Sequence, residues 1–168
     1  YRKQQGAYPV IYITFKDVKF DNWKDSLEAI RLVIRDEYMR HADILSWDGL
    51  DVVEKDYLDR MQKGTLSNVE YTRALLNLSR MLEKYHNKKI VVLIDEYDTP
   101  IQQGHSKGFY NEVITFMRNF MSGGLKDNPA LAFGVLTGIL RVSKENLFSG
   151  LNNLVVNSVL DEKYSEYF

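Results

Sequence analysis

The stretch Ile90-Val-Val-Leu-Ile-Asp-Glu96 decides how this chain folds. Its first five residues are aliphatic without alternation, which is typical of a strand covered on both faces in a parallel sheet. Two adjacent acids follow, and Pro100 comes soon after them, so the strand ends abruptly. We therefore expect a central strand at residues 90–94 that delivers carboxylates at its carboxyl end.

Three further segments are predicted as strands of the same sheet. Tyr8-Pro-Val-Ile-Tyr-Ile-Thr-Phe15 is dense in β-branched and aromatic residues, and its nearly continuous apolar character again favours coverage on both faces. Leu131-Ala-Phe-Gly-Val-Leu136 predicts a third strand, and Leu154-Val-Val-Asn-Ser-Val-Leu160 predicts a fourth.

Apolar residues at helical spacing lie between the predicted strands and indicate four helices. The first follows Asn22, a suitable N-cap, and the second begins near Asp48 and stops at Gly64. Ser67-Asn-Val-Glu70 has the capping-box pattern of the third, and Gly123-Gly124 closes the fourth. Strands that alternate with helices predict an α/β fold with a mainly parallel sheet flanked by helices.

The composition fits one folded domain over residues 1–168 and excludes several kinds of site. The absence of cysteine excludes disulfides, thiolate zinc sites and iron–sulfur clusters, and it fits a reducing, cytoplasmic location. The longest aliphatic run is far too short for a membrane span, so no membrane partner is expected. A net charge of −1 gives no general attraction to nucleic acid.

The acids after the central strand suggest magnesium and nucleotide chemistry. An aliphatic strand that ends in Asp-Glu is the Walker B pattern of nucleotide hydrolases. Asp95 would hold Mg²⁺ through its coordination shell, and Glu96 would polarise an attacking water. Alternatively, the two acids simply mark where a buried strand reaches the surface.

The end of the third predicted strand carries a second polar pair. In Val135-Leu-Thr-Gly-Ile-Leu-Arg141, a hydroxyl and a guanidinium follow the strand four residues apart. If the two strands are neighbours, Thr137 would sense a γ-phosphate and Arg141 would neutralise phosphate charge. The alternative is a turn followed by a surface arginine.

A phosphate-binding loop is absent from these 168 residues. The GxxxxGK[S/T] pattern wraps phosphates with backbone N–H groups and a lysine, and the sequence contains no Gly-Lys dipeptide. The three histidines show no metal-ligand spacing, so no histidine-based metal site is expected.

The ordered run of motifs resembles the predicted AAA-ATPase-like family of bacteria and archaea. The resemblance spans nearly the whole chain, and its most specific parts are Leu93-Ile-Asp-Glu-Tyr-Asp-Thr-Pro100 and Leu136-Thr-Gly-Ile-Leu-Arg141. It implies a P-loop NTPase fold with ATP and Mg²⁺ as cofactors and with Asp95 and Glu96 as Walker B acids. It also implies Thr137 or Arg141 near the nucleotide, and it suggests Asp98 as a further cofactor-binding residue.

The family pattern also implies that segments are missing from these 168 residues. The family's Walker A segment and first core strand lie upstream of Tyr8, so the chain looks like an incomplete P-loop core that is inactive alone. In the implied sheet order 5-1-4-3-2 the missing strand is central, and its loss would expose sheet edges through which the chain could self-associate. A nuclease-like domain follows in many members, so nucleic acid is an expected partner only of flanking domains.

Two other functions compete with an ATPase. One is a non-catalytic interaction module that has the ATPase-like fold but no nucleotide site. The other is a Mg²⁺-dependent nuclease, because Asp161-Glu-Lys163 has the D-x-K spacing of such sites and Asp95 could be the partner acid. A Gly-Lys-Ser/Thr loop upstream would favour the enzyme over the module.

Overall fold

A parallel three-stranded sheet forms the centre of the molecule. The computed structural model describes residues 6–139 and 155–158. Within them, the strands β1 (Val10–Thr14), β2 (Ile90–Asp95) and β3 (Leu131–Leu136) lie in the order β1-β2-β3. Both pairings are parallel, with Thr14 opposite Asp95 and Leu136 opposite Ile94. The predicted α/β class and the central position of the Ile90–Asp95 strand are therefore confirmed.

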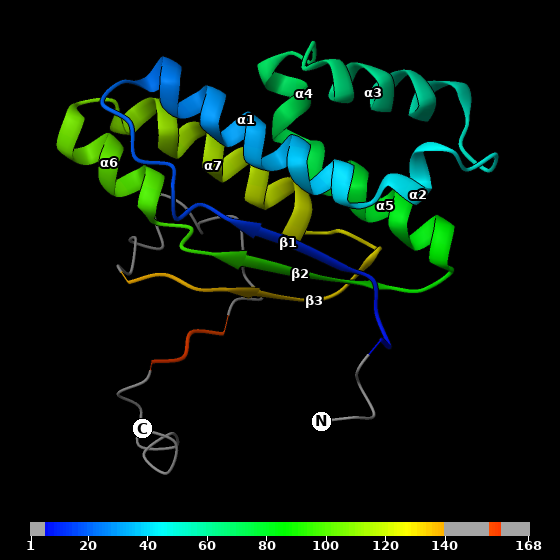
Figure 1. Ribbon diagram of the computed structural model, residues 1–168. Helices are drawn as coiled ribbons and strands as arrows, with labels where there is room; N and C mark the ends of the chain where they lie inside the picture. The colour runs from blue at the N-terminus through cyan, green and yellow to red at the C-terminus, as the bar shows by residue number, and fades with distance from the viewer. Residues whose placement is uncertain (1–5, 140–154, 159–168) are drawn as a thin grey trace.

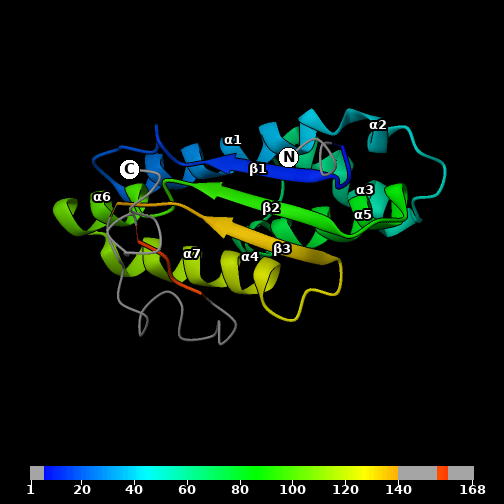
Figure 2. The same cartoon turned by 90° about the horizontal axis from the view of Figure 1, so that it is seen from below.

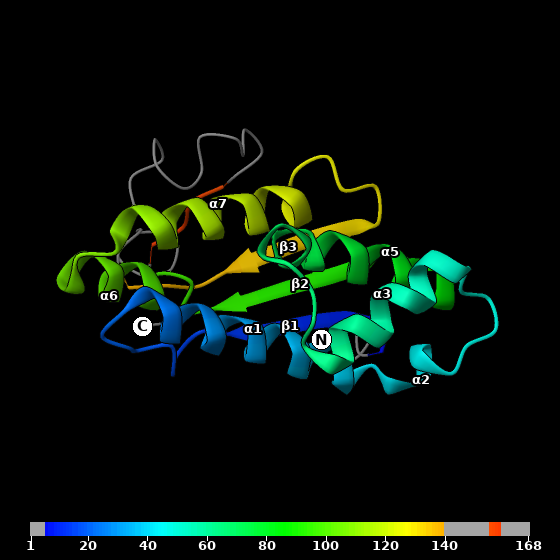
Figure 3. The ribbon, with the colours of Figure 1, turned by 90° about the horizontal axis from the view of Figure 1, so that it is seen from above.

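The helices of the described residues all lie on one face of this sheet (Figures 1 and 3). The long helix α1 runs along β1, and α7 and α5 pack against each other above the strands. The helices are α1 (Trp23–Arg40), α2 (Ala42–Leu45), α3 (Val52–Lys63), α4 (Asn68–Thr72), α5 (Ala74–His86), α6 (Thr99–Lys107) and α7 (Tyr110–Leu125).

The other face of the sheet carries no helix of the described residues (Figure 2). Burial along β1 alternates, with Ile11 and Ile13 buried beneath the helices and Tyr12 46% exposed. On β3, Phe133 is 50% exposed. The expectation that the first strand is covered on both faces is thus wrong within the described residues. The same expectation is wrong for β2, which also has no described helix on this face, although the strand is largely buried in its central position between β1 and β3.

Several predicted helix boundaries need correction. Asp51 rather than Asp48 caps α3, because its side chain accepts from the backbone N–H of Glu54 in a capping box. Helix α6 was not predicted, since its pattern is short and polar. The predicted third helix is divided into α4 and α5 at Arg73. The caps at Asn22 and Ser67 and the end of α3 at Gly64 are confirmed.

Gly123 and Gly124 do not end α7, which continues to Leu125. A Cβ on Gly124 would lie 2.3 Å from the side chain of Leu75. The glycine therefore lets α7 approach α5 closely, and packing against α5 outweighs the low intrinsic helix propensity of glycine. For the predicted fourth strand at 154–160, residues 155–158 have no strand structure and the others lie outside the described residues.

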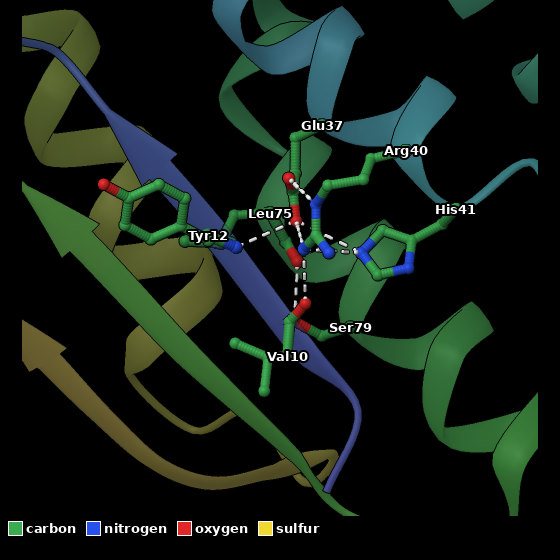
Figure 4. Close-up of polar contacts among 7 residues, drawn as sticks. All are labelled: Val10, Tyr12, Glu37, Arg40, His41, Leu75 and Ser79. Atoms are coloured by element: carbon green, nitrogen blue, oxygen red, sulfur yellow. Dashed lines mark hydrogen bonds and ion pairs between the residues drawn. The ribbon is translucent and has the colours of Figure 1, made fainter. Parts of the chain in front are cut away.

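Polar side chains of α1 occupy the outer edge of β1 (Figure 4). The Glu37 carboxylate accepts from the backbone N–H of Tyr12 at 2.8 Å, and Arg40 donates to the carbonyl of Val10 at 2.6 Å. Glu37 is 5% exposed, and Arg40 and His41 also contact its carboxylate. Burial raises the pKa of Glu37, but the hydrogen bonds from His41, Arg40 and Tyr12 outweigh it and hold that pKa below its usual value.

Candidate functional site

The three parallel strands end at one edge of the sheet, beside the start of α6 (Figure 2). In open α/β sheets, ligands bind beyond the carboxyl ends of the strands. The predicted acids and the threonine that follows β3 all lie at this edge. We call it the carboxyl edge, formed by residues 14, 95–99, 102 and 137–139.

Asp95 lies between two threonine hydroxyl groups at the carboxyl edge. Thr137 Oγ1 donates to Asp95 Oδ1 at 2.5 Å, and Thr14 Oγ1 donates to Asp95 Oδ2 at 3.2 Å. The register explains this arrangement, since Thr14 pairs with Asp95 and Thr137 comes directly after β3. Each carboxylate oxygen accepts one hydroxyl and keeps acceptor capacity for a further ligand.

Glu96 follows in a left-handed backbone conformation with φ of 49°. This conformation costs a non-glycine residue conformational energy. Residues strained in this way are often found at functional sites. Its carboxylate accepts from the Thr99 hydroxyl at 3.1 Å, and its carbonyl accepts from the Thr99 N–H at 3.2 Å. The turn thereby gives the two adjacent acids separate hydrogen-bond partners, Thr14 and Thr137 for Asp95 and Thr99 for Glu96.

Asp98 is the most deeply buried acid at the carboxyl edge, with 1% of its surface exposed. Its Oδ2 accepts from the amide nitrogen of Gln102 at 2.6 Å and from the backbone N–H of Ile139 at 3.1 Å. Asp98 therefore joins the turn after β2 to the turn after β3.

Backbone hydrogen bonds continue the pairing of β2 and β3 into these turns. The N–H of Thr137 donates to the carbonyl of Ile94 at 2.9 Å, and the N–H of Tyr97 donates to the carbonyl of Thr137 at 3.1 Å. Thr137 is therefore fixed by its own backbone as well as by the contact between its hydroxyl and Asp95. The threonine side chain remains exposed, so a ligand could reach it.

The donor set suits a cation that keeps most of its own water. Within residues 6–139 and 155–158, no group of three or more His, Asp or Glu side chains could enclose a metal ion. Mg²⁺ is commonly held by one or two carboxylates together with water and substrate phosphates. The partly exposed Asp95 carboxylate, flanked by two hydroxyl groups, fits that mode of binding.

The structure brings together four of the five predicted site residues. They are Asp95, Glu96, Asp98 and Thr137. The fifth, Arg141, lies outside the described residues, as do Asp161 and Lys163 of the alternative nuclease motif.

Sequence reasoning missed three polar residues at this edge, Thr14, Thr99 and Gln102. Thr14 is the polar residue that ends an otherwise apolar strand, and the parallel register places it opposite Asp95. That position was a usable signal. Gln102 gave none, because its role depends on the helix α6 that follows the acids.

Comparison with known proteins decides the family. A family model described as predicted AAA-ATPase (AAA-ATPase_like) matches residues 1–148, which is most of the chain. The chain belongs to the predicted AAA-ATPase family. Its α/β core agrees with this membership.

This AAA-ATPase-like chain is also similar to a curated protein from Azotobacter chroococcum mcd 1, described as an uncharacterized protein in the vnfD 5' region. The two are 40% identical over 90 residues, which is 52% of this chain and 17% of that protein. The match thus spans less than a fifth of the relative's length. No solved structure matches the chain. No helix of the described residues has the length and apolar character needed to cross a membrane.

Proposed function

We propose that the protein containing this chain binds and hydrolyses ATP with Mg²⁺, and that these residues supply the Walker B acids and the groups beside the γ-phosphate. The observation that carries the proposal is the 2.5 Å contact between Thr137 and Asp95. It joins the two most specific family motifs, far apart in the sequence, at the one edge of the sheet where ligands of such folds bind.

Each residue has a distinct role in this proposal. Asp95 holds the hydrated cation, and the two threonine hydroxyls keep its carboxylate in one orientation. Glu96 accepts a proton from the attacking water, and Thr99 orients its carboxylate. Thr137 lies beside the γ-phosphate while its one hydroxyl proton is donated to Asp95, and Arg141 offsets the charge that develops on the phosphate. When bound, Mg²⁺ would neutralise negative charge on the phosphates.

The 168 residues contain no phosphate-binding loop, so the proposal assigns that part to a segment upstream. The chain alone is expected to show no ATP turnover. If the longer protein has no Gly-Lys-Ser/Thr loop and does not bind ATP, a non-catalytic interaction module with this fold replaces the ATPase.

The proposal is tested by substitutions in the longer protein. Glu96→Gln is expected to lower kcat for ATP by about 100-fold or more while ATP binding is kept, because only the general base is lost. Asp95→Asn is expected to lower turnover and to raise the Mg²⁺ concentration needed for half-maximal turnover. Glu112→Gln is a matched control, since Glu112 is an exposed carboxylate on α7 away from the carboxyl edge. Unchanged turnover in Glu96→Gln would show that the role given to Glu96 is wrong.

A further inference from the structure

Asp98 lies at the carboxyl edge but is turned away from solvent. Its side chain is 1% exposed, whereas Asp95 and Glu96 are only partly buried. A group that is covered by the protein in this way is poorly placed to touch a nucleotide. The carboxylate instead accepts hydrogen bonds from Gln102 in α6 and from Ile139 in the turn after β3.

The contact with Ile139 fastens the chain as it leaves β3. The side chain of Ile139 is 87% exposed, so apolar packing does not anchor this residue. Its backbone N–H donates to Asp98 Oδ2 at 3.1 Å, and the amide of Gln102 donates to the same oxygen. Buried carboxylates that accept N–H groups form strong hydrogen bonds, so this contact is well suited to fix a turn.

Gly138 makes the close approach of the two turns possible. A Cβ at this position would lie 2.6 Å from Asp98 Oδ1 and 2.8 Å from Cε1 of Tyr97. Both distances are shorter than normal van der Waals contact, so any larger residue would push the turn away from Asp98. The glycine of the Leu-Thr-Gly motif is thus explained by its contact with Asp98.

We propose that Asp98 is a positioning residue that places Thr137 against Asp95. The Asp98 side chain contacts residues 138–139 directly. Only two residues separate Ile139 from the end of β3, so fixing Ile139 restricts the position of Thr137. The catalytic consequence of this placement rests on the proposed ATPase function, but the placement itself does not. Asp98 then acts on the nucleotide through Thr137 and without touching the ligand.

The structural part is tested on the 168-residue chain by amide hydrogen exchange. Asp98→Ala is expected to speed exchange of the Ile139 amide by at least about tenfold relative to the Val92 amide in the central strand. Ser79→Ala is the matched control, because it removes a buried hydroxyl that donates to the carbonyl of Leu75 in the same helix. It should leave the ratio of the two exchange rates unchanged.

A second variant keeps the proposal testable if Asp98→Ala does not fold. Gly138→Ala retains the carboxylate but adds the methyl group for which there is no room, so it should also speed Ile139 exchange. In the double variant the two effects should be less than additive, because both act on one contact. If Ile139 exchange follows Val92 exchange in every variant that folds, the proposal is wrong.

The catalytic part is tested by steady-state kinetics of the longer protein. Asp98→Ala should lower kcat about tenfold or more with little change in KM for ATP, and Asp98→Asn, which keeps an acceptor oxygen, should restore part of kcat. A large rise in KM with kcat unchanged would instead show direct nucleotide contact and overturn the positioning role. If Asp95→Asn and Glu96→Gln also leave turnover unchanged, the proposed ATPase function fails, while the exchange result still decides the role of Asp98 in placing the turn.

Discussion

At the scale of single residues, the carboxyl edge depends on hydroxyl groups as much as on acids. Asp95 contacts Thr14 on one side and Thr137 on the other, so its orientation is set by strands on both sides of β2. A carboxylate held in this way loses little freedom when it takes up a cation, which favours binding. The hydroxyl groups are therefore expected to affect the affinity for the cation more than the free energy of unfolding.

Removing one hydroxyl tests this expectation. Thr137→Val in the longer protein is expected to lower kcat for ATP by about tenfold and to raise the Mg²⁺ concentration needed for half-maximal turnover. The free energy of unfolding should fall by only about 0.5–1.5 kcal/mol, because the lost hydrogen bond is partly exposed. Kinetics at varied Mg²⁺ and urea unfolding measure the two effects.

Thr115→Val serves as the control for this substitution. Thr115 is exposed on α7, and its hydroxyl donates to the carbonyl of Asn111 in the same helix. Thr115→Val should leave kcat and the Mg²⁺ concentration for half-maximal turnover unchanged. Equal Mg²⁺ dependence in Thr137→Val and in the parent protein would contradict the role given to Thr137.

At the scale of elements, helix α1 stabilises the edge of the sheet through side-chain contacts with its backbone. Glu37 and Arg40 bond the free N–H of Tyr12 and the carbonyl of Val10, groups that an added strand would otherwise use (Figure 4). Charged side chains at an edge are a known defence against unwanted strand pairing. The edge at β1 is thus closed by residues of the chain itself.

Two Glu–Arg pairs on α1 allow a matched comparison of this contact. Glu37→Ala should lower the free energy of unfolding by about 2–3 kcal/mol, because it removes a buried carboxylate that accepts from the Tyr12 N–H and pairs with Arg40. Glu28→Ala removes the exposed pair with Arg31, which has the same spacing, and should cost at most about 1 kcal/mol. Urea unfolding of both variants gives the comparison, and equal losses would contradict the edge contact.

The capping box of α4 predicts a dependence of stability on pH. Hydrogen bonds from the Ser67 backbone and hydroxyl, together with Arg60, lower the pKa of Glu70 to about 2. A carboxyl whose pKa is depressed by folding contributes stability above its unfolded value of 4.5, and this is lost as the pH falls toward 2. Glu70→Gln should therefore be less stable than the parent chain at pH 7.

The difference between Glu70→Gln and the parent chain should shrink between about pH 4.5 and pH 2, measured by urea unfolding at several pH values. Glu112→Gln is the control for the loss of an exposed carboxylate in the first turn of a helix. A difference that stays constant down to the lowest pH at which the chain folds would contradict the role of Glu70.

At the scale of the whole molecule, the sheet is covered by described helices on one face only (Figures 1 and 2). The opposite face presents large apolar side chains from two strands and the segment before β1. They are Tyr8, Tyr12, Phe133 and Val135, each between 40% and 50% exposed. Tyr8 and Phe133 contact each other across this face with ring centroids 6.1 Å apart. Apolar side chains gathered on one face favour association.

We expect the 168-residue chain to self-associate through this face and the edge at β3, since Glu37 and Arg40 close the edge at β1. Analytical ultracentrifugation should show a sedimentation coefficient that rises with concentration. Phe133→Glu should weaken this association, because it places a charge within the apolar face.

Val53→Glu is the matched control, since Val53 is an apolar side chain that is 77% exposed on the distant helix α3. It should sediment like the parent chain. A parent chain that remains a monomer at all concentrations and melts cooperatively would contradict the expectation.

The sequence alone determined the α/β class, the central strand and the acids at its end. These features follow from local composition, because a continuous aliphatic run favours a central strand and adjacent acids favour the point where such a strand ends. Most helix caps were also readable, since a cap depends on residues three positions apart. The continuation of α7 through Gly123 and Gly124 was not, because it depends on Leu75 in another helix.

Contacts between segments far apart in the sequence determine which face of the sheet the helices cover and which residues meet at its carboxyl edge. Thr14 and Asp95 end two strands and Thr137 directly follows the third, so register sets their contacts. The burial of Asp98 likewise depends on Gly138 and Ile139, some 40 residues away. Local sequence fixes where a strand ends and which groups it carries there, but hydrogen-bond register and close packing between distant segments decide which of those groups touch.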